Sequence, residues 1–327
     1  MSDRKKILLS APVPDDLVEQ LQQEYEVVVG SSAQVVATDT VDEYADLDGW
    51  LTTVKQPVRE ELLKRLPKLQ VVSNFAVGYD NVDVAAASRR GVSVCNTPGV
   101  LDDAVATLTI GLLISVARRM PAGDVFVREG QWRKGAFPLT TDLHGKVIGI
   151  LGMGRIGRKV ARIAGALGMV VTYHNRTRDE EAEAAGLASY RDRDTLIAES
   201  DFVSLHLPLT AESRHGFGAE ELKRMKSTAY LVNTARGPVL DEEALVAALE
   251  NGEIAGAALD VFEQEPLSGE SRLMSLDNVV LQPHAGSGTV ETRRAMMEMA
   301  VRNLRAVLEG RAPESLVNPD VAGSRAS

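Results

Sequence analysis

The amino-acid sequence predicts an α/β protein in which two doubly wound parallel sheets form two domains. The chain has 327 residues, which is more than one ordinary hydrophobic core holds and suits two domains. Short apolar runs alternate with amphipathic helical patterns along most of the chain, as is typical of parallel sheets covered by helices. The stretch 146–178 combines a strand, a glycine-rich turn, a helix and a second strand. Both domains are therefore expected to be Rossmann-like.

The first domain is expected to run from a strand at residues 6–9 to the turn sequence Asn-Thr-Pro-Gly at 96–99. Runs of apolar and β-branched residues predict its other strands at 26–29, 50–54, 69–75 and 92–95. Apolar residues at helical spacing predict helices at 14–25, 59–66 and 82–90. Pro67 and Gly91 mark where two of these helices stop.

Two segments between the domains have a different character. Residues 101–117 predict a buried helix that crosses between the domains, too polar at its start and too short for a membrane span. Residues 121–142 are predicted to be irregular, and segments of this length are often functional or form interfaces. Trp132 in this segment could contact a partner subunit or a substrate, or could anchor local packing, and the sequence leaves these alternatives open.

The second domain is predicted from the same alternation. Its strands are expected at 147–151, 169–173, 202–205, 229–232, 257–261 and 279–281. Helices are expected from the glycine-rich turn to 167 and at 195–198, 219–225, 242–250 and 290–308. The last helix is placed to return the chain to the first domain. We therefore expect a domain at 100–289 that is inserted into a flavodoxin-like domain made of 1–99 and 290–327.

The glycine-rich turn predicts a dinucleotide site. Gly152, Gly154 and Gly157 form G-x-G-x-x-G directly after a strand and at the start of a helix. The first glycine permits the tight turn, the second lets the backbone approach a pyrophosphate, and the third lets helix and strand pack closely. The domain at 100–289 is accordingly expected to bind a dinucleotide, and the domain at 1–99 and 290–327 to bind the substrate.

The end of the second strand indicates which dinucleotide. Proteins that bind NAD usually place an acid there to accept the ribose 2′-OH. This chain has Asn175, Arg176, Thr177 and Arg178 instead. The asparagine does not repel a 2′-phosphate, and two arginines with a hydroxyl can bind one through charge-assisted hydrogen bonds. NADP(H) is therefore predicted to be preferred over NAD(H). The alternative is that the two arginines are solvent-exposed loop residues that bind no ligand.

Composition excludes several classes of function. The formal net charge of −10 argues against nucleic acid or an anionic membrane as a partner, because both attract basic surfaces. The single cysteine, Cys95, rules out an intramolecular disulfide and cysteine-pair metal sites, and no metal is expected. The N-terminal apolar run is too short for a signal peptide, and no window approaches eighteen uncharged apolar residues. A cytoplasmic location is expected.

Three polar residues follow predicted strands of the second domain, where ligands of parallel sheets bind. Arg236 follows the strand at 229–232, and its planar guanidinium suits a carboxylate. Glu265 follows the strand at 257–261, and His284 follows the strand at 279–281. A carboxylate beside a histidine favours the imidazolium and orients the ring, which gives a general acid for reduction of a carbonyl and a base for the reverse oxidation. Each of these residues could instead be structural.

These motifs together resemble a known family. The segments LKRMKSTAYLVNTARGPVLDEEAL, GAALDVFEQEPL and NVVLQPHAGSGT resemble the D-isomer-specific 2-hydroxyacid dehydrogenases. The resemblance covers nearly the whole chain, because NFAVGYDNVD and NTPGV in the first domain share it. It implies that Arg236 binds substrate and takes part in catalysis, that His284 is the acid/base, and that Glu265 is its partner.

The resemblance also implies the remaining contacts. Val77 and Gly78 would offer backbone amides to the substrate carboxylate, with Arg236 and His284 beside it, and Asp260 would bind the nicotinamide carboxamide. The residues expected around the rest of the cofactor are Arg155 and Ile156 at the pyrophosphate, and Leu207, Pro208, Thr234, Ala235, Arg236, His284 and Gly286 in the cleft. A homodimer is implied, with the crossing helix and the following loop in the interface. The chain departs from the family pattern at Val105, Thr107 and Ala285.

The cofactor loop YHNRTR resembles the NADPH-dependent glyoxylate/hydroxypyruvate reductase branch, and the stretch WRKGAFPLTTDLHGK resembles the hydroxypyruvate and hydroxyphenylpyruvate reductases. The predicted function is therefore an NADPH-preferring reductase that converts glyoxylate or hydroxypyruvate to glycolate or D-glycerate. Two alternatives stay open. One is a reductase of bulkier 2-ketoacids such as hydroxyphenylpyruvate or 2-ketogluconate, which loops around Lys55 and Phe75 should decide. The other is a dinucleotide-sensing interaction protein on the same fold.

Overall fold

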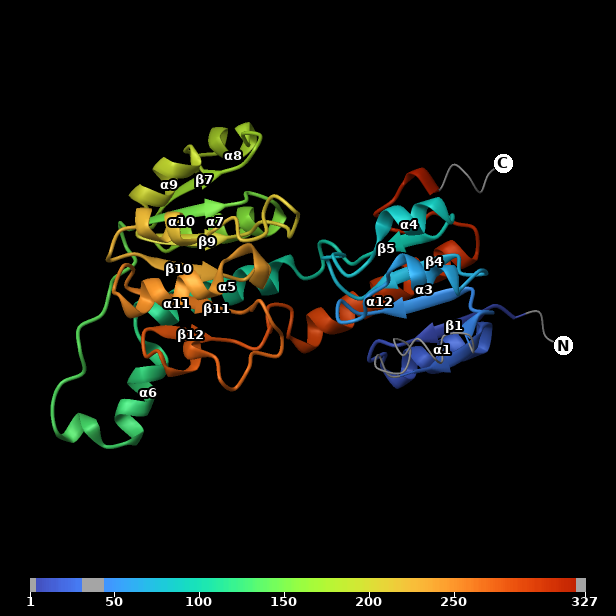
Figure 1. Ribbon diagram of the computed structural model, residues 1–327, viewed down its shortest axis with the longest axis horizontal. Helices are drawn as coiled ribbons and strands as arrows, with labels where there is room; N and C mark the ends of the chain where they lie inside the picture. Colours follow the sequence, from blue (N-terminus) through green and yellow to red (C-terminus); the bar gives the residue numbers. More distant parts are fainter. Residues whose placement is uncertain (1–3, 31–43, 322–327) are drawn as a thin grey trace. The chain divides into compact units, whose positions relative to one another are not determined.

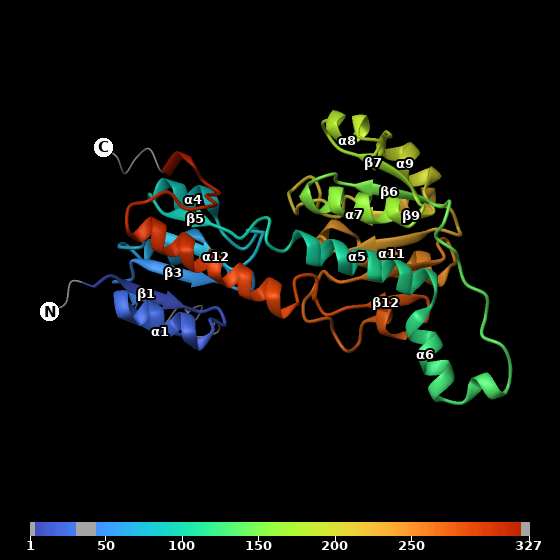
Figure 2. The same cartoon turned by 180° about the vertical axis from the view of Figure 1, so that it is seen from behind.

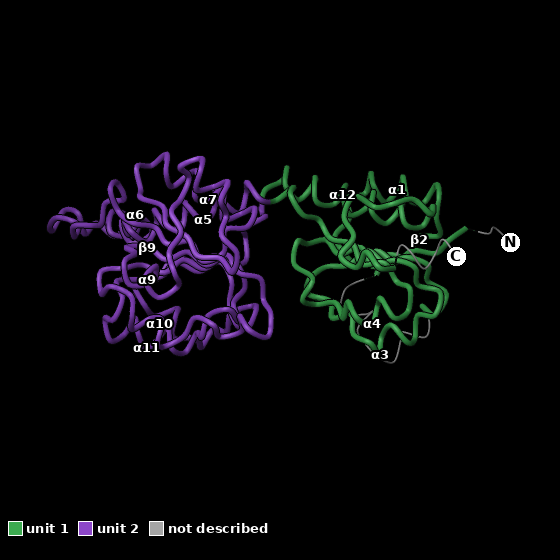
Figure 3. Tube along the Cα trace, turned by 90° about the horizontal axis from the view of Figure 1, so that it is seen from above, with its two compact units in different colours: residues 1–101, 289–327 green, residues 102–288 purple. Residues whose placement is uncertain are grey.

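The computed structural model describes residues 4–30 and 44–321, and the chain divides into two compact units (Figure 3). Unit 1 consists of residues 1–101 and 289–327, and unit 2 of residues 102–288. The expected boundaries at 99–100 and 289–290 lie beside these positions. The chain is an α/β protein with two parallel sheets, as predicted.

Unit 1 contains a five-stranded parallel sheet in the order β2-β1-β3-β4-β5. Its strands are β1 (Lys6–Leu9), β2 (Glu26–Val29), β3 (Gly49–Thr52), β4 (Val71–Asn74) and β5 (Ser93–Cys95). Its helices are α1 (Asp15–Glu24), α3 (Glu60–Lys64), α4 (Val84–Arg89) and α12 (Val290–Leu308). Figure 3 shows α1 and α12 on one face of the sheet and α3 and α4 on the other. This strand order is that of flavodoxin-like folds, as expected.

The last helix of the chain is an integral part of unit 1. Ser73 Oγ of β4 donates a hydrogen bond of 2.7 Å to the Ala300 carbonyl of α12. A Cβ atom at Gly49 would lie 2.9 Å from Leu304 Cδ1, so α12 packs directly on the backbone of β3. The predicted return of the chain to its first domain is therefore a close packing contact, visible where α12 crosses the sheet in Figure 2.

Unit 2 contains a seven-stranded parallel sheet in the order β12-β11-β10-β9-β6-β7-β8. Its strands are β6 (Val147–Leu151), β7 (Val170–His174), β8 (Ser189–Tyr190), β9 (Phe202–Leu205), β10 (Tyr230–Asn233), β11 (Gly256–Leu259) and β12 (Val279–Leu281). Its helices are α5 (Asp102–Ala117), α6 (Met120–Arg128), α7 (Arg155–Ala166), α8 (Glu180–Ala184), α9 (Arg193–Glu199), α10 (Ala219–Arg224) and α11 (Glu242–Glu250). The direction of strand succession reverses at β6, between β7 and β9, which is where doubly wound sheets bind ligands beyond their carboxyl ends.

Helices cover both faces of this sheet, with α5 and α7 on one face and α9, α10 and α11 on the other (Figures 1 and 3). Two buried apolar clusters result, one around Ile150 and Phe202 and one around Leu205 and Leu231. Burial of both faces explains why the strands read as continuous apolar runs rather than alternating ones.

The expectation of an irregular segment at 121–142 was wrong at its start, because α6 (Met120–Arg128) is a regular helix followed by a 3-10 turn at Gln131–Arg133. Pro121 lies in the first turn, where a helix does not need its missing N–H. Asp124 and Arg128 form an i,i+4 ion pair of 2.7 Å along the helix. The helix buries none of its residues within this chain, although its apolar residues recur at helical spacing.

Among residues 4–30 and 44–321, no single helix is long and apolar enough to cross a membrane. Helices α5 and α6 pass the length and hydropathy criterion only when taken together, and they bend by 57° at the break between them.

Candidate functional site

The glycine-rich turn of unit 2 has the shape that a pyrophosphate requires. Gly152 has φ of 104°, and a Cβ atom there would lie 2.5 Å from the His206 carbonyl oxygen. A Cβ atom at Gly157 would lie 2.2 Å from the Gly152 carbonyl oxygen, so helix α7 can approach β6 only with glycine there. Gly154 borders open space, with nothing within 4 Å of its Cβ position. No side chain caps the N-terminus of α7, and the amides of its first turn are available to an anion.

Arg155, the first residue of α7, meets a residue that sequence reasoning missed. Its Nε donates a hydrogen bond of 3.1 Å to Oδ2 of Asp102, the first residue of α5. Asp102 is 2% exposed. The sequence offered no signal for this pair, because the two residues come from helices separated by a long segment.

The loop after β7 contains the residues predicted to choose the dinucleotide. Asn175 Oδ1 accepts a hydrogen bond of 2.7 Å from the Met153 amide, which ties this loop to the glycine-rich turn. Arg178 pairs with the Glu183 carboxylate through both Nε and Nη2, and its guanidinium carbon lies 5.1 Å from the centre of the Tyr190 ring. Thr177 and Arg176 are exposed, and within the described part of the chain Arg176 has no hydrogen bond or ion pair. The two arginines therefore differ in their surroundings.

Glu265 and His284 meet in the structure. His284 Nδ1 lies 2.6 Å from Glu265 Oε2, and both side chains are about one-third exposed, at 38% and 30%. Glu265 Oε1 accepts a second hydrogen bond of 3.1 Å from the Phe262 amide. Burial, the largest single effect, raises the pKa of Glu265, but the hydrogen bond and charge of His284, the Phe262 amide and the charge of Arg236 outweigh it and leave the pKa lowered. An ionised Glu265 fixes Nδ1 of His284 as a hydrogen-bond donor and leaves Nε2 for other chemistry.

Asp260 holds the backbone of His284 and the two residues after it. The Asp260 carbonyl accepts the His284 amide at 2.8 Å, and its Oδ1 and Oδ2 accept the Ala285 and Gly286 amides at 2.6 and 2.8 Å. His284 has φ of 54°, which is uncommon for a residue with a side chain and persists only where the surroundings enforce it. Burial raises the pKa of Asp260, and the two amides offset part of that rise. Sequence reasoning placed Asp260 at the cofactor, and the structure adds a direct role in positioning His284.

Arg236 follows β10 in a loop that lies against the segment leading to Glu265. A Cβ atom at Gly237 would lie 1.8 Å from the Phe262 carbonyl oxygen, so only glycine permits this approach. Arg236 Nη1 donates a hydrogen bond of 2.7 Å to the Ala235 carbonyl. The charge of Arg236 also contributes to the lowered pKa of Glu265. All three residues chosen from the sequence thus lie at the carboxyl edge of adjacent strands β10, β11 and β12.

The other residues predicted to contact the cofactor follow strands of the same sheet. Leu207 and Pro208 come after β9, Thr234 and Ala235 after β10, and Gly286 after β12. Leu207 Cδ2 lies 3.3 Å from the Cβ position of Gly152, so the side chain borders the glycine-rich turn.

In unit 1, two asparagines hold the loop that was predicted to bind a carboxylate. Asn96 Nδ2 donates a hydrogen bond of 2.7 Å to the Val77 carbonyl, and Asn74 Nδ2 donates one of 2.8 Å to the Gly78 carbonyl. With their carbonyls fixed in this way, the peptides of this loop have a defined orientation. Sequence reasoning missed both asparagines, although each one ends or follows a strand. Phe75 is buried with the Arg293 guanidinium carbon 5.6 Å from its ring centre.

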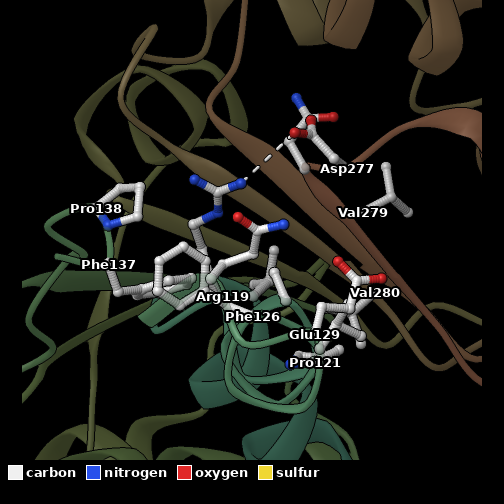
Figure 4. Close-up of a pocket in the computed structure, with 14 residues that line it drawn as sticks. Arg119, Pro121, Phe126, Glu129, Phe137, Pro138, Asp277, Val279 and Val280 are labelled. Carbon is white, nitrogen blue, oxygen red and sulfur yellow. Dashed lines mark ion pairs between the residues drawn. The ribbon is translucent and has the colours of Figure 1, made fainter. Parts of the chain in front are cut away.

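A separate cavity of about 470 Å³ lies at α6 and includes none of these residues (Figure 4). Its wall includes Val125, Phe126, Phe137 and Val280, and Arg119 forms an ion pair of 3.5 Å with Asp277 at its edge. Trp132 lies close by in sequence and is 69% exposed, so it anchors no local packing.

Comparison with known proteins gives a consistent result. A family model described as the NAD binding domain of D-isomer specific 2-hydroxyacid dehydrogenases matches residues 110–286. The glyoxylate reductase of Thermococcus litoralis is 44% identical, over 98% of this chain and 99% of its own length. The glyoxylate reductase of Aeropyrum pernix is 46% identical, over 98% of each chain. A solved structure of the NADPH-dependent glyoxylate/hydroxypyruvate reductase of Sinorhizobium meliloti, in complex with NADP and malonate, has a TM-score of 0.87 and 37% identity over 96% of this chain and 97% of that one.

Proposed function

The chain belongs to the D-isomer specific 2-hydroxyacid dehydrogenase family, and from this premise we propose that it reduces glyoxylate and hydroxypyruvate to glycolate and D-glycerate with NADPH preferred over NADH. Membership makes the protein an oxidoreductase that uses a nicotinamide dinucleotide, and relatives at this identity support activity on 2-ketoacids. The choice of substrate and the preference for NADPH are the proposal. The observation that supports 2-ketoacid reduction most is the contact of 2.6 Å between His284 and Glu265 beside Arg236, and the preference for NADPH is supported by Asn175 and Arg176.

In the proposed reaction, each of the three strand-end residues has one task. Arg236 binds the substrate carboxylate as a permanently charged planar fork. Glu265 accepts the Nδ1 proton of His284 and stabilises the imidazolium. His284 donates the Nε2 proton to the substrate oxygen during reduction and takes it back during oxidation. When bound, the nicotinamide dinucleotide supplies the reducing equivalent. In unit 1, the amides of Val77 and Gly78 are proposed to assist in binding the carboxylate.

The residues present fit the dinucleotide. Gly154 leaves open space above the uncapped N-terminus of α7, which suits a pyrophosphate. Asn175 stands where an acid would discriminate against a 2′-phosphate, and Arg176 is exposed without an ion pair in the described residues. Thr177 and Arg178 complete this proposed subsite. The structure of the Sinorhizobium meliloti relative with NADP supports the same choice for this chain.

A homodimer is part of the proposal. Residues 120–139 expose a group of large apolar side chains, which monomeric proteins rarely leave together on a surface. Their exposed fractions are 55% for Met120, 49% for Val125, 69% for Trp132 and 100% for Leu139. Because α6 buries none of its residues within the chain, a second copy is the proposed cover for this helix and the cavity beside it.

Steady-state kinetics with a panel of 2-ketoacids and both dinucleotides would test the function. We expect the highest kcat/KM with glyoxylate or hydroxypyruvate and NADPH. A higher kcat/KM with hydroxyphenylpyruvate or 2-ketogluconate would move the assignment to bulkier substrates. Binding of a dinucleotide without turnover of any 2-ketoacid would instead favour a sensing protein on this fold.

A further inference from the structure

Two buried threonines connect helix α5 to the strand end beside the proposed nicotinamide site. Thr109 Oγ1 lies 2.8 Å from Thr234 Oγ1, and Thr109 is 0% and Thr234 8% exposed. Thr109 Oγ1 also lies 2.8 Å from the Val105 carbonyl oxygen, one turn earlier in α5. Neither the family resemblance nor the reaction proposed above uses Thr109.

The two contacts allow only one arrangement of protons in which both are hydrogen bonds. A carbonyl cannot donate, so the single hydroxyl proton of Thr109 must go to the Val105 carbonyl. Thr234 must then donate its own proton to Thr109. Since that proton is committed, Thr234 Oγ1 can only accept hydrogen bonds from any further partner.

Thr234 lies next to a second hydrogen-bond acceptor, the Asp260 carboxylate. Asn233 of β10 pairs with Leu259 of β11, so Thr234 and Asp260 each follow a paired residue at the carboxyl edge of the sheet. The Asp260 oxygens already take the Ala285 and Gly286 amides, and a carboxylate oxygen has a further lone pair to offer. The side chains of Thr234 and Asp260, at two neighbouring strand ends, therefore both act as hydrogen-bond acceptors and leave no proton free to donate.

We propose that Thr109 is a positioning residue that fixes the Thr234 hydroxyl as an acceptor for the carboxamide –NH₂ of the nicotinamide. The inference rests on the proposed use of a nicotinamide dinucleotide. A carboxamide –NH₂ carries two donor protons, which matches a pair of acceptors at adjoining strand ends. Without the Thr109 hydroxyl, Thr234 can turn its proton toward that –NH₂ group, and a donor would then face a donor.

Calorimetric dissociation constants of the full-length protein test this without relying on turnover. In Thr109→Val the shape is kept and the hydroxyl is lost, and we expect NADP⁺ to bind about threefold to tenfold more weakly, as for loss of one hydrogen bond. The 3-acetylpyridine analogue of NADP⁺ has a methyl group in place of –NH₂, so its affinity should change by less than about twofold in the same variant. Thr109→Ser keeps a hydroxyl and should bind both ligands as the wild type does.

Thermal denaturation of the variants checks that they fold. Equal weakening of NADP⁺ and the acetylpyridine analogue in Thr109→Val would overturn the inference and leave the proposed function intact. In Thr234→Val the acceptor itself is gone, so adding Thr109→Val should cause no further loss, and additive losses would also overturn it. A wild-type protein that binds no nicotinamide dinucleotide would overturn the proposed function and the inference together.

Discussion

Arg176 is expected to distinguish NADPH from NADH more strongly than Arg178, although both were predicted to bind the 2′-phosphate. Arg178 is engaged by the Glu183 carboxylate and lies over the Tyr190 ring, so a phosphate must share it with an existing partner. Arg176 is exposed and has no hydrogen bond or ion pair among the described residues, although its charge contributes to the lowered pKa of Glu212. Its guanidinium can therefore turn toward the phosphate without breaking a pair.

The expected magnitude follows from these surroundings. A hydrogen bond to a charged group contributes about 1.5–3 kcal/mol, so Arg176→Ala should weaken NADPH binding about tenfold to a hundredfold. Arg178→Ala should weaken it by no more than about threefold, in line with the small contribution of an exposed ion pair. Both variants should bind NADH within about twofold of the wild type, because NADH lacks the 2′-phosphate.

Dissociation constants for NADPH, NADH and adenosine 2′,5′-bisphosphate would be measured by calorimetry at low and high salt. The loss in Arg176→Ala should shrink at high salt, since exposed charges are screened. Glu183→Gln is a matched control. It removes the carboxylate that pairs with Arg178, so Arg178 becomes available to the 2′-phosphate and NADPH should bind more tightly. The reasoning is refuted if Arg176→Ala weakens NADH as much as NADPH, or if Arg178→Ala is the more damaging change.

Three further outcomes are expected. His284→Ala should lower kcat at least about a hundredfold with dinucleotide affinity retained, and wild-type-like turnover would remove its role as acid/base. Trp132→Glu should shift the protein from dimer to monomer in light scattering, whereas the matched control Met274→Glu, exposed by 59% outside the apolar segment, should not. Burial lowers the pKa of His206 from 6.5 to about 4. Between pH 6.5 and about 4, His206 is therefore protonated in the unfolded chain but neutral in the folded one. The free energy of unfolding falls as the pH drops through this range. His206→Gln should remove up to about 3 kcal/mol of this loss in urea denaturation, and identical pH profiles would contradict it.

Much of the fold could be predicted from the sequence because its signals are local. Most strands of both sheets follow from apolar runs, of which the central ones are buried on two faces, and the helix Val290–Leu308 lies where its spacing predicts it. Helix α6 was missed although its apolar residues recur at helical spacing, and none of them is buried within the chain. The short elements α8 and β8 were also missed, since 5 and 2 residues carry little periodicity.

The sequence by itself determined which residues to consider, because a strand end is a local feature and Arg236, Glu265 and His284 each follow one. Only the tertiary structure decided which of them meet. His284 and Glu265 are 19 positions apart and come together because β11 and β12 are neighbours in the sheet. The proton arrangement of Thr109 and Thr234, 125 positions apart, and the different surroundings of Arg176 and Arg178 likewise depend on sheet order and helix packing. Those contacts are long-range, and no local propensity encodes them.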